Sequence, residues 1–337
     1  MSQAAAITTR LAPSPTGALH LGNARTFLVN WALAQQHGWR VVLRIDDLDS
    51  PRVKPGADAQ AIEMLRWLGL DWDGPIAYET RNLEHYAVAL EKLAAGGWIY
   101  PCRCTRSQIA AAAMSAPHVD EHELRYPGTC RPTQQIACEF QANLPGAAWR
   151  LRVPDKDFEF SDGILGQQSW NVQQLVGDFL VTNKQGAAAY QLAVVIDDAL
   201  QGVTDVVRGA DLLGSTPRQI WLHELLGFQP PNYWHVPLLV GPDGQRLAKR
   251  HGGFRLEEYR SLGVPVERVI GLIAWWSGCG ELRPQSLAEF VAGFRLERLP
   301  REPIVFRACD QLCQTLRAKF SAARPPRDQA NHSLDRH

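Results

Sequence analysis

The stretch that decides the fold is Arg10–Asn23, which reads RLAPSPTGALHLGN. It follows a short β-prone run that starts at Thr8, and the PSPTG segment within it cannot continue a strand or a helix. From Asn23 apolar residues recur at helical spacing as far as His37, and the next run, Val41–Ile45, is mostly apolar, as buried parallel strands are. This order of strand, loop, helix and strand predicts a βαβ unit and therefore an α/β fold.

The alternation of strand-like and helix-like segments, its α/β rhythm, divides the rest of the chain into parts. Residues 1–99 are expected to form the first half of a Rossmann-like, doubly wound parallel sheet, with further helices at 62–68 and 86–93. The rhythm is lost over 100–189, which predicts an inserted subdomain with a few strands, one of them at 149–153. Residues 190–254 are expected to complete the sheet. A helical region at 255–300 and a basic, partly disordered tail at 301–337 follow.

Composition excludes several classes of protein. The chain of 337 residues is 45% hydrophobic and 21% charged, which is ordinary globular composition. No apolar run is long enough to span a membrane, and the first residues lack the basic head and apolar stretch of a signal peptide. We therefore expect a cytoplasmic protein that is independent of membranes. Its 35 basic residues balance 35 acidic ones, so any binding of nucleic acid must depend on local patches.

The Arg10–Asn23 stretch has the features of a phosphate-binding loop. A loop between a first strand and a helix presents free amides and the positive end of the helix dipole to a ligand. Gly17 and Gly22 would let the backbone approach a nucleotide closely, and His20 would donate a hydrogen bond to a phosphate. Taken alone, a His-x-Gly triplet is a weak signal, because a turn with a surface histidine has the same sequence.

A second segment fits the same chemistry. Residues 241–251, GPDGQRLAKRH, follow an apolar strand and are rich in glycine and cations. A lysine in such a loop, Lys249, would stabilise charge as pyrophosphate leaves. The alternative for this segment is a solvated hairpin with surface charges.

Together these segments resemble a known family. HLGN at 20–23 and RLAKR at 246–250 resemble the HIGH and KMSKS signatures of class I aminoacyl-tRNA synthetases. RLAPSPTG at 10–17, RIDDLD at 44–49, YQLAVVIDD at 190–198 and VRGAD at 207–211 are similar to the glutamyl-tRNA synthetase group in particular. The motifs stand in the family's order over residues 7 to 280. The resemblance implies the class I catalytic core.

The chain after Lys249 is short for the helical anticodon-binding domain of a full glutamyl-tRNA synthetase, so it resembles the truncated glutamyl-Q tRNA(Asp) synthetase group. That resemblance implies an enzyme, expected to be a monomer, that uses ATP and Mg²⁺ to convert L-glutamate into glutamyl-adenylate. The glutamyl group would then pass to queuosine in the anticodon stem-loop of tRNA(Asp). Two alternatives remain open: a small glutamyl-tRNA synthetase that charges the 3′ end of tRNA(Glu), and a non-catalytic RNA-binding paralogue.

The resemblance also assigns roles to residues. Arg10 and Arg208 would hold the carboxylates of glutamate, Asp46 its ammonium group, and Tyr190 would orient it. The other expected glutamate-binding residues are Leu11, Ala12, Pro13 and Ser14. The expected ATP-binding residues are Gly17, His20, Gly22, Asn23 and Lys249, of which His20, Gly22 and Lys249 are expected to be catalytic. The alternatives are an acidic helix-capping turn at 46–49 and a core aromatic at Tyr190.

Three positions depart from the family pattern. Asp46 stands where the family usually has Glu, so its carboxylate is one methylene shorter. Arg246 and Ala248 replace the usual lysine and serine of the second signature. Since Lys249 is intact, these changes put the rate in doubt rather than the function. Arginines of the insert are expected to contact RNA phosphates, namely Arg103, Arg106, Arg125 and Arg131.

Seven cysteines without a secretory signal favour a reduced compartment and metal chemistry over disulfides. The pattern Cys102-x-Cys104 with Tyr126-x-x-x-Cys130 resembles the zinc site of the same group, which implies one structural Zn²⁺ with these four ligands. The alternatives are a histidine, His118 or His122, in place of Tyr126, and three free cysteines. The other cysteines are expected to be buried hydrophobes, namely Cys138, Cys279, Cys309 and Cys313.

Overall fold

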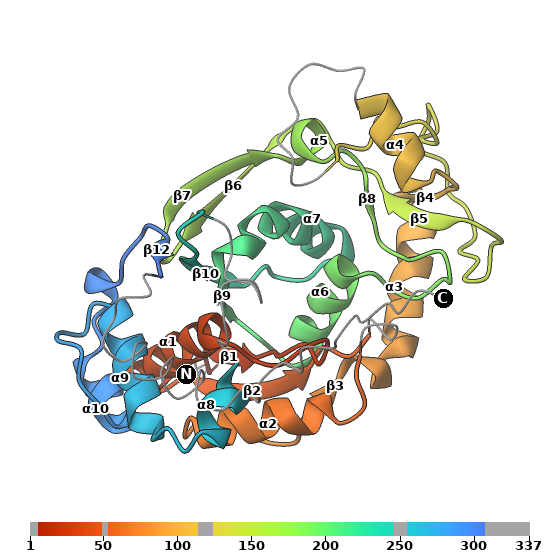
Figure 1. Ribbon diagram of the computed structural model, residues 1–337. Helices are drawn as coiled ribbons and strands as arrows, with labels where there is room; N and C mark the ends of the chain where they lie inside the picture. The colour runs from red at the N-terminus through yellow and green to blue at the C-terminus, as the bar shows by residue number, and fades with distance from the viewer. Residues whose placement is uncertain (1–5, 49–52, 114–123, 245–254, 307–337) are drawn as a thin grey trace, which may run out of the picture.

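The structure, a computed structural model, describes residues 6–48, 53–113, 124–244 and 255–306. Its centre is a parallel sheet in two parts. In the first part β1 (Thr8–Leu11) pairs with β2 (Arg40–Ile45), which pairs with β3 (Ala77–Tyr78). In the second, β9 (Asp205–Gly209) pairs with β10 (Asn232–Val236). The main-chain N–H of Thr204 donates to the Thr8 carbonyl at 2.9 Å and lays β9 beside β1, as Figure 1 shows.

The strand order is therefore β3-β2-β1-β9-β10, and it reverses between β1 and β9. In open α/β sheets, ligands bind at this reversal, outside the carboxyl ends of the strands. The α/β class and the parallel sheet expected from the sequence are confirmed.

Helix α1 (Leu21–His37) begins two residues before the Asn23 indicated by the apolar pattern. The reason is its cap. The side chain of His20 accepts hydrogen bonds from the first turn, and Gly38 ends the helix in the left-handed conformation with a φ of 66°.

Helices cover both faces of the sheet. Side chains alternate between these faces along each strand, so neighbouring residues of a strand pack into different cores. In β9, Val207 packs into the core that contains α1, whereas Val206 belongs to a cluster that meets Ile220. The first face carries α1, α2 (Ala57–Trp67), α8 (Leu256–Ser261), α9 (Val266–Trp276) and α10 (Leu287–Gly293). A second core joins α3 (Leu83–Ala95), α6 (Tyr190–Leu200) and α7 (Thr216–Leu226).

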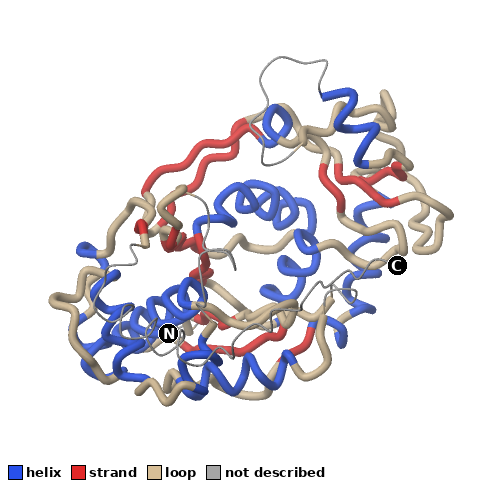
Figure 2. Tube along the Cα trace, viewed as in Figure 1, coloured by secondary structure: helices blue, strands red, loops and turns tan. Residues whose placement is uncertain are grey.

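Residues 100–189 contribute two structures. An antiparallel sheet is formed by β4 (Ile99–Cys102), β5 (Ala148–Leu151) and β8 (Phe179–Leu180), with α4 (Arg106–Ala113) and α5 (Val172–Leu175) beside it. The second is a long hairpin, visible in Figure 2, made of β6 (Asp157–Asp162) and β7 (Gly166–Asn171). The strand expected at 149–153 is β5, which begins and ends slightly earlier.

The hairpin is also part of the central sheet. Its strand β6 pairs in parallel with β10 at Asp162 and Tyr233, and the N–H of Gly163 donates to the Tyr233 carbonyl at 2.8 Å. A Cβ at Gly163 would lie only 2.1 Å from the ring of Trp234, so glycine is required for this close approach. The hairpin therefore places Asp162 beside Tyr233 of β10 in the central sheet.

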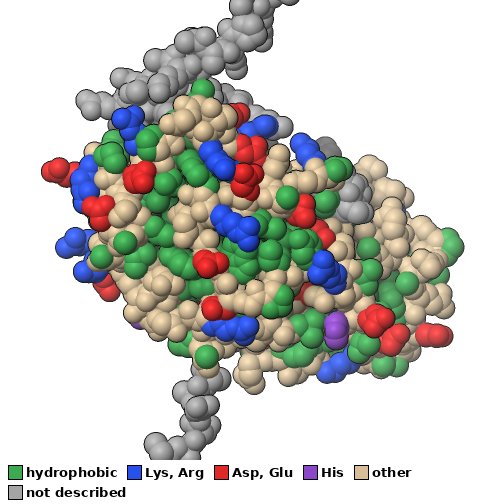
Figure 3. Space-filling view, turned by 90° about the horizontal axis from the view of Figure 1, so that it is seen from below, with side chains coloured by type: hydrophobic (Ala, Val, Ile, Leu, Met, Phe, Trp, Pro, Cys, Tyr) green, Lys and Arg blue, Asp and Glu red, His purple; other side chains and the backbone are tan. Residues whose placement is uncertain are grey.

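The short remaining elements are η1 (Glu79–Arg81), η2 (Ala210–Ser215), η4 (Leu296–Arg298), β11 (Leu239–Val240) and β12 (Ile304–Val305). Most of the expected tail, 301–337, lies outside the described residues. No described helix is both long and apolar enough to cross a membrane. Figure 3 views the molecule from below, and on the described part of that face acidic and basic side chains are interspersed without a broad basic patch.

Candidate active site

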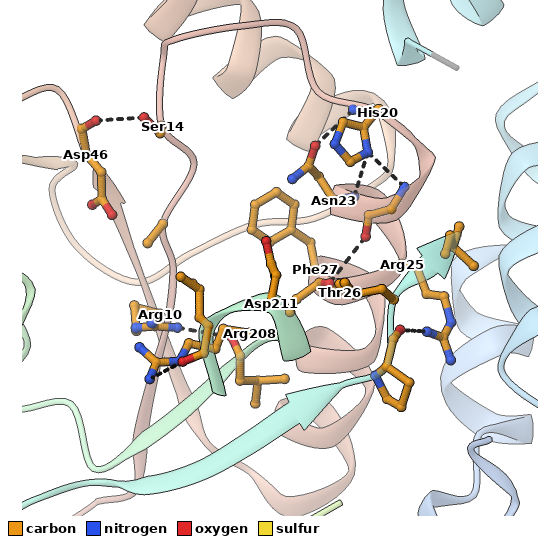
Figure 4. A pocket seen from close by; sticks show the side chains of 18 of the residues that line it. Arg10, Ser14, His20, Asn23, Arg25, Thr26, Phe27, Asp46, Arg208 and Asp211 are labelled. Carbon is orange, nitrogen blue, oxygen red and sulfur yellow. Dashed lines mark hydrogen bonds between the residues drawn. The ribbon is translucent and has the colours of Figure 1, made fainter. Parts of the chain in front are cut away.

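A cavity of about 520 Å³ opens where the strand order reverses between β1 and β9. Most of the expected glutamate- and ATP-binding residues line it: Arg10, Ala12, Ser14, His20, Gly22, Asn23, Asp46, Tyr190 and Arg208. Figure 4 shows how they are distributed, with Asp46 and Ser14 at one end, His20 and Asn23 at the other, and Arg10 and Arg208 between. The fold thus brings together side chains that are far apart in the sequence.

One end of the cavity is the start of α1. The Nδ1 atom of His20 accepts hydrogen bonds from the main-chain N–H of Gly22 at 3.1 Å and of Asn23 at 3.4 Å. The Oδ1 atom of Asn23 accepts in return from the N–H of His20 at 3.1 Å. Because Nδ1 is an acceptor, the proton of neutral His20 is on Nε2, which makes that nitrogen the donor. The histidine is therefore held in the tautomer that suits a phosphate contact.

The two glycines of the loop differ in the space that is available for a side chain. A Cβ at Gly22 would stand 3.0 Å from Cε1 of His20, so a larger residue would press on the capping ring. Gly17 is exposed, a Cβ there meets nothing within 4 Å, and Gly17 does not line the main cavity. The described structure gives Gly22, but not Gly17, a steric requirement.

The floor of the cavity holds two buried arginines. Arg10 donates from Nη1 to the Val207 carbonyl at 3.0 Å, and its Nε lies 3.4 Å from Asp198. Arg208 donates to Gln219 at 2.8 Å, to Thr216 at 2.8 Å and, from Nε, to Nε2 of His235 at 3.0 Å. Burial lowers the pKa of Arg10, although Asp198 opposes the shift. A negatively charged ligand would therefore stabilise these two buried arginines.

Arg208 is held by a chain of hydrogen bonds that extends through His235 to Asp162 of the hairpin. His235 accepts from Arg208 at Nε2, so its proton is on Nδ1 and is donated to Oδ2 of Asp162 at 2.6 Å. Oδ1 of Asp162 accepts from the N–H groups of Ile164 and Leu165. Burial raises the pKa of Asp162, but the bond from His235 and those from the N–H groups of Ile164 and Leu165 together outweigh it, and the net pKa is lowered. Asp162 is therefore a carboxylate that orients His235, and His235 orients Arg208.

Asp46 lies at the other end of the cavity and is paired. Its Oδ1 accepts from Nε of Arg44 at 2.7 Å, and Nη1 of Arg44 donates to Asp198 at 2.6 Å. Its backbone N–H donates to the Pro13 carbonyl, and Ser14 donates to the Asp46 carbonyl at 3.2 Å. Burial raises the pKa of Asp46, and Arg44 opposes this shift. Asp46 thus fits an ion-paired position at the cavity rather than a helix cap.

The remaining expected residues lie as follows. Tyr190 begins α6, is 39% exposed and lines the cavity, so the alternative that it is a core aromatic is wrong. Leu11 is fully buried and packs in the core instead of lining the cavity. Lys249, with Arg246 and Ala248, lies outside the described residues. The chain next described, at Arg255, forms a bridge to His20.

Sequence reasoning did not single out the residues that position the arginines. Arg44, Asp162, Asp198 and His235 are all nearly or fully buried. A signal was present for two of them, because a charged Arg44 and a histidine at 235 interrupt otherwise apolar strands. Buried charges are found almost only in pairs, so each predicts a partner but does not identify it.

A separate cluster contains the expected metal ligands. The sulfur atoms of Cys102, Cys104 and Cys130 all lie within 4.8 Å of one another. The hydroxyl of Tyr126 is 3.4 Å from Cys102 Sγ and accepts from the N–H of Cys130 at 2.7 Å. The four side chains converge, and they could hold a metal ion. His118 and His122 lie outside the described residues.

Within the cluster, the surroundings of Cys102 favour a thiolate. Burial raises the pKa of Cys102, but its hydrogen bonds with Tyr126 and with Nε of Arg150, at 3.3 Å, lower the pKa to about 7. Burial and the neighbouring thiols raise the pKa of Cys104 to about 11. Sulfur that loses its proton is what a soft divalent metal binds. Of the other cysteines, Cys138 is exposed, so the expectation that it is buried is wrong.

Comparison with known proteins agrees with this geometry. Residues 6–291 match the family model for tRNA synthetases class I (E and Q), catalytic domain. A glutamyl-Q tRNA(Asp) synthetase from Symbiobacterium thermophilum is 47% identical over 88% of this chain and 94% of its own length. One from Nitratidesulfovibrio vulgaris is 44% identical over the same shares of the two chains.

Solved structures agree in fold. A glutamate tRNA ligase from Elizabethkingia meningosepticum, in complex with its amino acid, superposes with a TM-score of 0.74 at 24% identity, over 93% of this chain and 69% of that one. Glutamate-tRNA synthetase from Elizabethkingia anophelis gives 0.75 at 24% identity, over 95% and 71%. This chain belongs to the class I tRNA synthetases (E and Q), and within them to the glutamyl-Q tRNA(Asp) synthetases.

Proposed function

We propose that this protein activates L-glutamate with ATP and transfers the glutamyl group to the queuosine base of tRNA(Asp). The observation that carries the proposal is one cavity that combines two buried arginines, a carboxylate and the capped start of α1. Arginines suit the two carboxylates of glutamate, Asp46 suits its ammonium group, and a helix start suits phosphate. The names of the relatives support the choice of acceptor.

In the first step an oxygen of the glutamate α-carboxylate attacks the α-phosphorus of ATP. The bond from that phosphorus to the bridging oxygen breaks, and pyrophosphate leaves with the electron pair. Mg²⁺ bound to ATP neutralises part of the phosphate charge. Arg10 and Arg208 position the amino acid, and Tyr190 at the rim orients it. The protein forms no covalent intermediate.

Stabilisation of the developing charge falls to His20 and Lys249. The tautomer imposed by the α1 cap leaves Nε2–H of His20 as the donor, at the positive end of the α1 dipole. The role of Lys249 rests on the resemblance of RLAKR, at 246–250, to the second signature of the family. Its charge matters most as pyrophosphate departs.

In the second step a hydroxyl of the cyclopentenediol of queuosine attacks the carbonyl carbon of the adenylate. An ester forms, AMP leaves, and the hydroxyl proton passes to solvent. Arg103, Arg106 and Arg125 are exposed on the insert and are available to RNA phosphates. Arg131 is less available, because its Nη1 pairs with Asp178 at 3.0 Å and donates to the Val153 carbonyl.

We also infer one structural zinc on Cys102, Cys104, Tyr126 and Cys130. The donor set fits, since three thiols converge with a phenol hydroxyl to offer four ligands, the number that Zn²⁺ prefers. When bound, the ion supplies a cross-link between the end of β4 and the loop at 126–130. The four side chains do not line the main cavity, so the ion would take no part in the chemistry.

The test is charging with radiolabelled glutamate and ATP. We expect label on tRNA(Asp) that carries queuosine, and on its isolated anticodon stem-loop, but not on tRNA(Asp) without queuosine or on tRNA(Glu). Periodate cleavage of the queuosine diol should abolish charging. Label at the 3′ end of tRNA(Glu) would overturn the acceptor. Absence of glutamate-dependent pyrophosphate exchange would instead favour the non-catalytic paralogue.

A further inference from the structure

A second cavity of about 390 Å³ adjoins the glutamate cavity and shares Ser14, Asp46 and Tyr190 with it. Glu79, a residue that the proposed mechanism does not use, also lines this second cavity. Asp46 lines both cavities, and its charge acts on Glu79. The site expected to hold the ammonium group of glutamate is therefore shared with the cavity that Glu79 lines.

The position of Glu79 follows from strand register. β2 and β3 are parallel neighbours, and Ile45 stands opposite Tyr78 at their carboxyl ends. The next residues along the two strands are Asp46 and Glu79. Adjacent parallel strands thus deliver two carboxyl groups to the edge where ligands bind in this fold.

Glu79 is buried and incompletely bonded. It is 3% exposed, and its Oε2 accepts from the N–H of Leu48 at 3.2 Å. Its Oε1 has no hydrogen-bond partner among the described residues. The nearby cation, Arg44, bonds Asp46 from Nε and Asp198 from Nη1, and its Nη2, which has no partner among the described residues, makes no hydrogen bond to Glu79. A buried carboxyl oxygen without a partner is costly, and a bound cationic group would relieve that cost.

The groups that face Glu79 reinforce this need for a cation. Asp46 and Arg44 approach from β2, and Asp197 from α6, while the Tyr86 hydroxyl of α3 donates to Asp197 at 2.6 Å and lies 3.1 Å from the Glu79 carbonyl. Burial, followed by the Asp46 carboxylate, raises the pKa of Glu79 to about 9. Without a ligand Glu79 is therefore protonated near neutral pH, and an approaching ammonium group would favour its ionisation.

We propose that Glu79 is a second carboxylate for the ammonium group of glutamate, so that the amino acid is held between Asp46 and Glu79 and its binding releases a proton. This inference rests on the proposed function, since it assumes that glutamate occupies the main cavity. Glu79 is a specificity-determining residue in this scheme, because it strengthens binding of a ligand that carries a cationic group in addition to two carboxylates. A diacid without an ammonium group would gain nothing from it.

The experiment is titration calorimetry of the full chain with L-glutamate in buffers of different ionisation enthalpy, near pH 7. The dependence of the heat on the buffer measures protons released. We expect release from the unsubstituted protein and none from Glu79→Gln, whose affinity for glutamate should fall by on the order of 10- to 100-fold. Glutamate should also bind up to about tenfold more tightly per pH unit between about pH 6 and pH 8, and this slope should vanish in Glu79→Gln.

Two controls separate the role of Glu79 from general effects. Glutarate, which lacks the ammonium group, should bind without proton release and with equal affinity to both proteins. Glu84→Gln changes an exposed glutamate in the first turn of α3 and should behave like the unsubstituted protein. Glutamate binding without proton release, or release that persists in Glu79→Gln, would overturn the role of Glu79 alone. Absence of glutamate binding to the unsubstituted protein would overturn the proposed function as well.

Discussion

Asp162 accepts a hydrogen bond of 2.6 Å from Nδ1 of His235, and both side chains are fully buried. Asp162 ends a strand of the hairpin at 157–171, whereas His235 lies in β10 and holds Arg208. Asp162 therefore links the hairpin, through His235, to Arg208 in the main cavity. Changes in this part of the insert should affect amino acid binding even though the hairpin does not line the cavity.

The first prediction concerns that chain of hydrogen bonds. In Asp162→Asn the amide N–H₂ would face Nδ1 of His235 and favour the other tautomer, which then places Nε2–H against the N–H of Arg208. We expect the KM for glutamate in pyrophosphate exchange to rise by on the order of tenfold or more, with a smaller change in the KM for ATP. Asp157→Asn, an exposed change on the same strand, is the matched control. Equal effects on both substrates would show a folding defect instead.

The second prediction concerns Lys249. Lys249→Ala should reduce the rate of glutamate activation by on the order of 100-fold or more, because a transition-state donor is lost, while glutamate affinity changes little. Exchange kinetics without RNA measure it. Lys156→Ala is the control, since Lys156 is exposed and pairs with Glu224 away from the cavity. Unchanged exchange in Lys249→Ala would remove this lysine from the mechanism.

The third prediction concerns the metal. Elemental analysis after dialysis should find one zinc per chain, and Cys104→Ser should lower that content, because a site with three protein ligands binds more weakly. Loss of zinc should destabilise the insert, so that transfer to RNA falls while glutamate activation survives. Cys138→Ser, at an exposed cysteine outside the cluster, should keep its zinc. Normal transfer by a zinc-free protein would contradict the structural role.

The fourth prediction is a pH dependence of stability. Burial lowers the pKa of His223 to about 4, and its Nδ1 has no hydrogen-bond partner among the described residues. Its folded pKa lies below the ordinary value, so the unfolded chain binds the proton first and the folded state loses stability as pH falls below about 6.5. Between pH 7 and pH 5, His223 should lower the free energy of unfolding by about 2 kcal/mol.

Denaturant unfolding at the two pH values measures this difference. His223→Gln should flatten the dependence by that amount, whereas His85→Gln, at an exposed histidine of α3, should leave it unchanged. A slope that persists in His223→Gln would mean that other groups produce it.

The sequence alone determined the features that depend on local order. The breaker-rich loop before His20, the apolar strands on either side of α1 and the spacing of Cys102 and Cys104 are all readable within a few residues. They led to the α/β class, the expected phosphate-binding helix start and the cysteine cluster. Short-range patterns of this kind reflect backbone and side-chain preferences that act between near neighbours.

Only the tertiary structure decided which charged groups are paired and which of the described ones keep an atom without a hydrogen-bond partner. The chain supplies Arg44, Asp46, Glu79 and Asp198 without indicating that Arg44 takes two of the carboxylates and leaves Glu79 short of a cation. The same holds for the bond from His235 to Asp162, whose strands are far apart in the sequence. Such pairings depend on strand register and on burial, which raises the energetic cost of every charge that lacks a partner. Neither exists until the sheet is assembled.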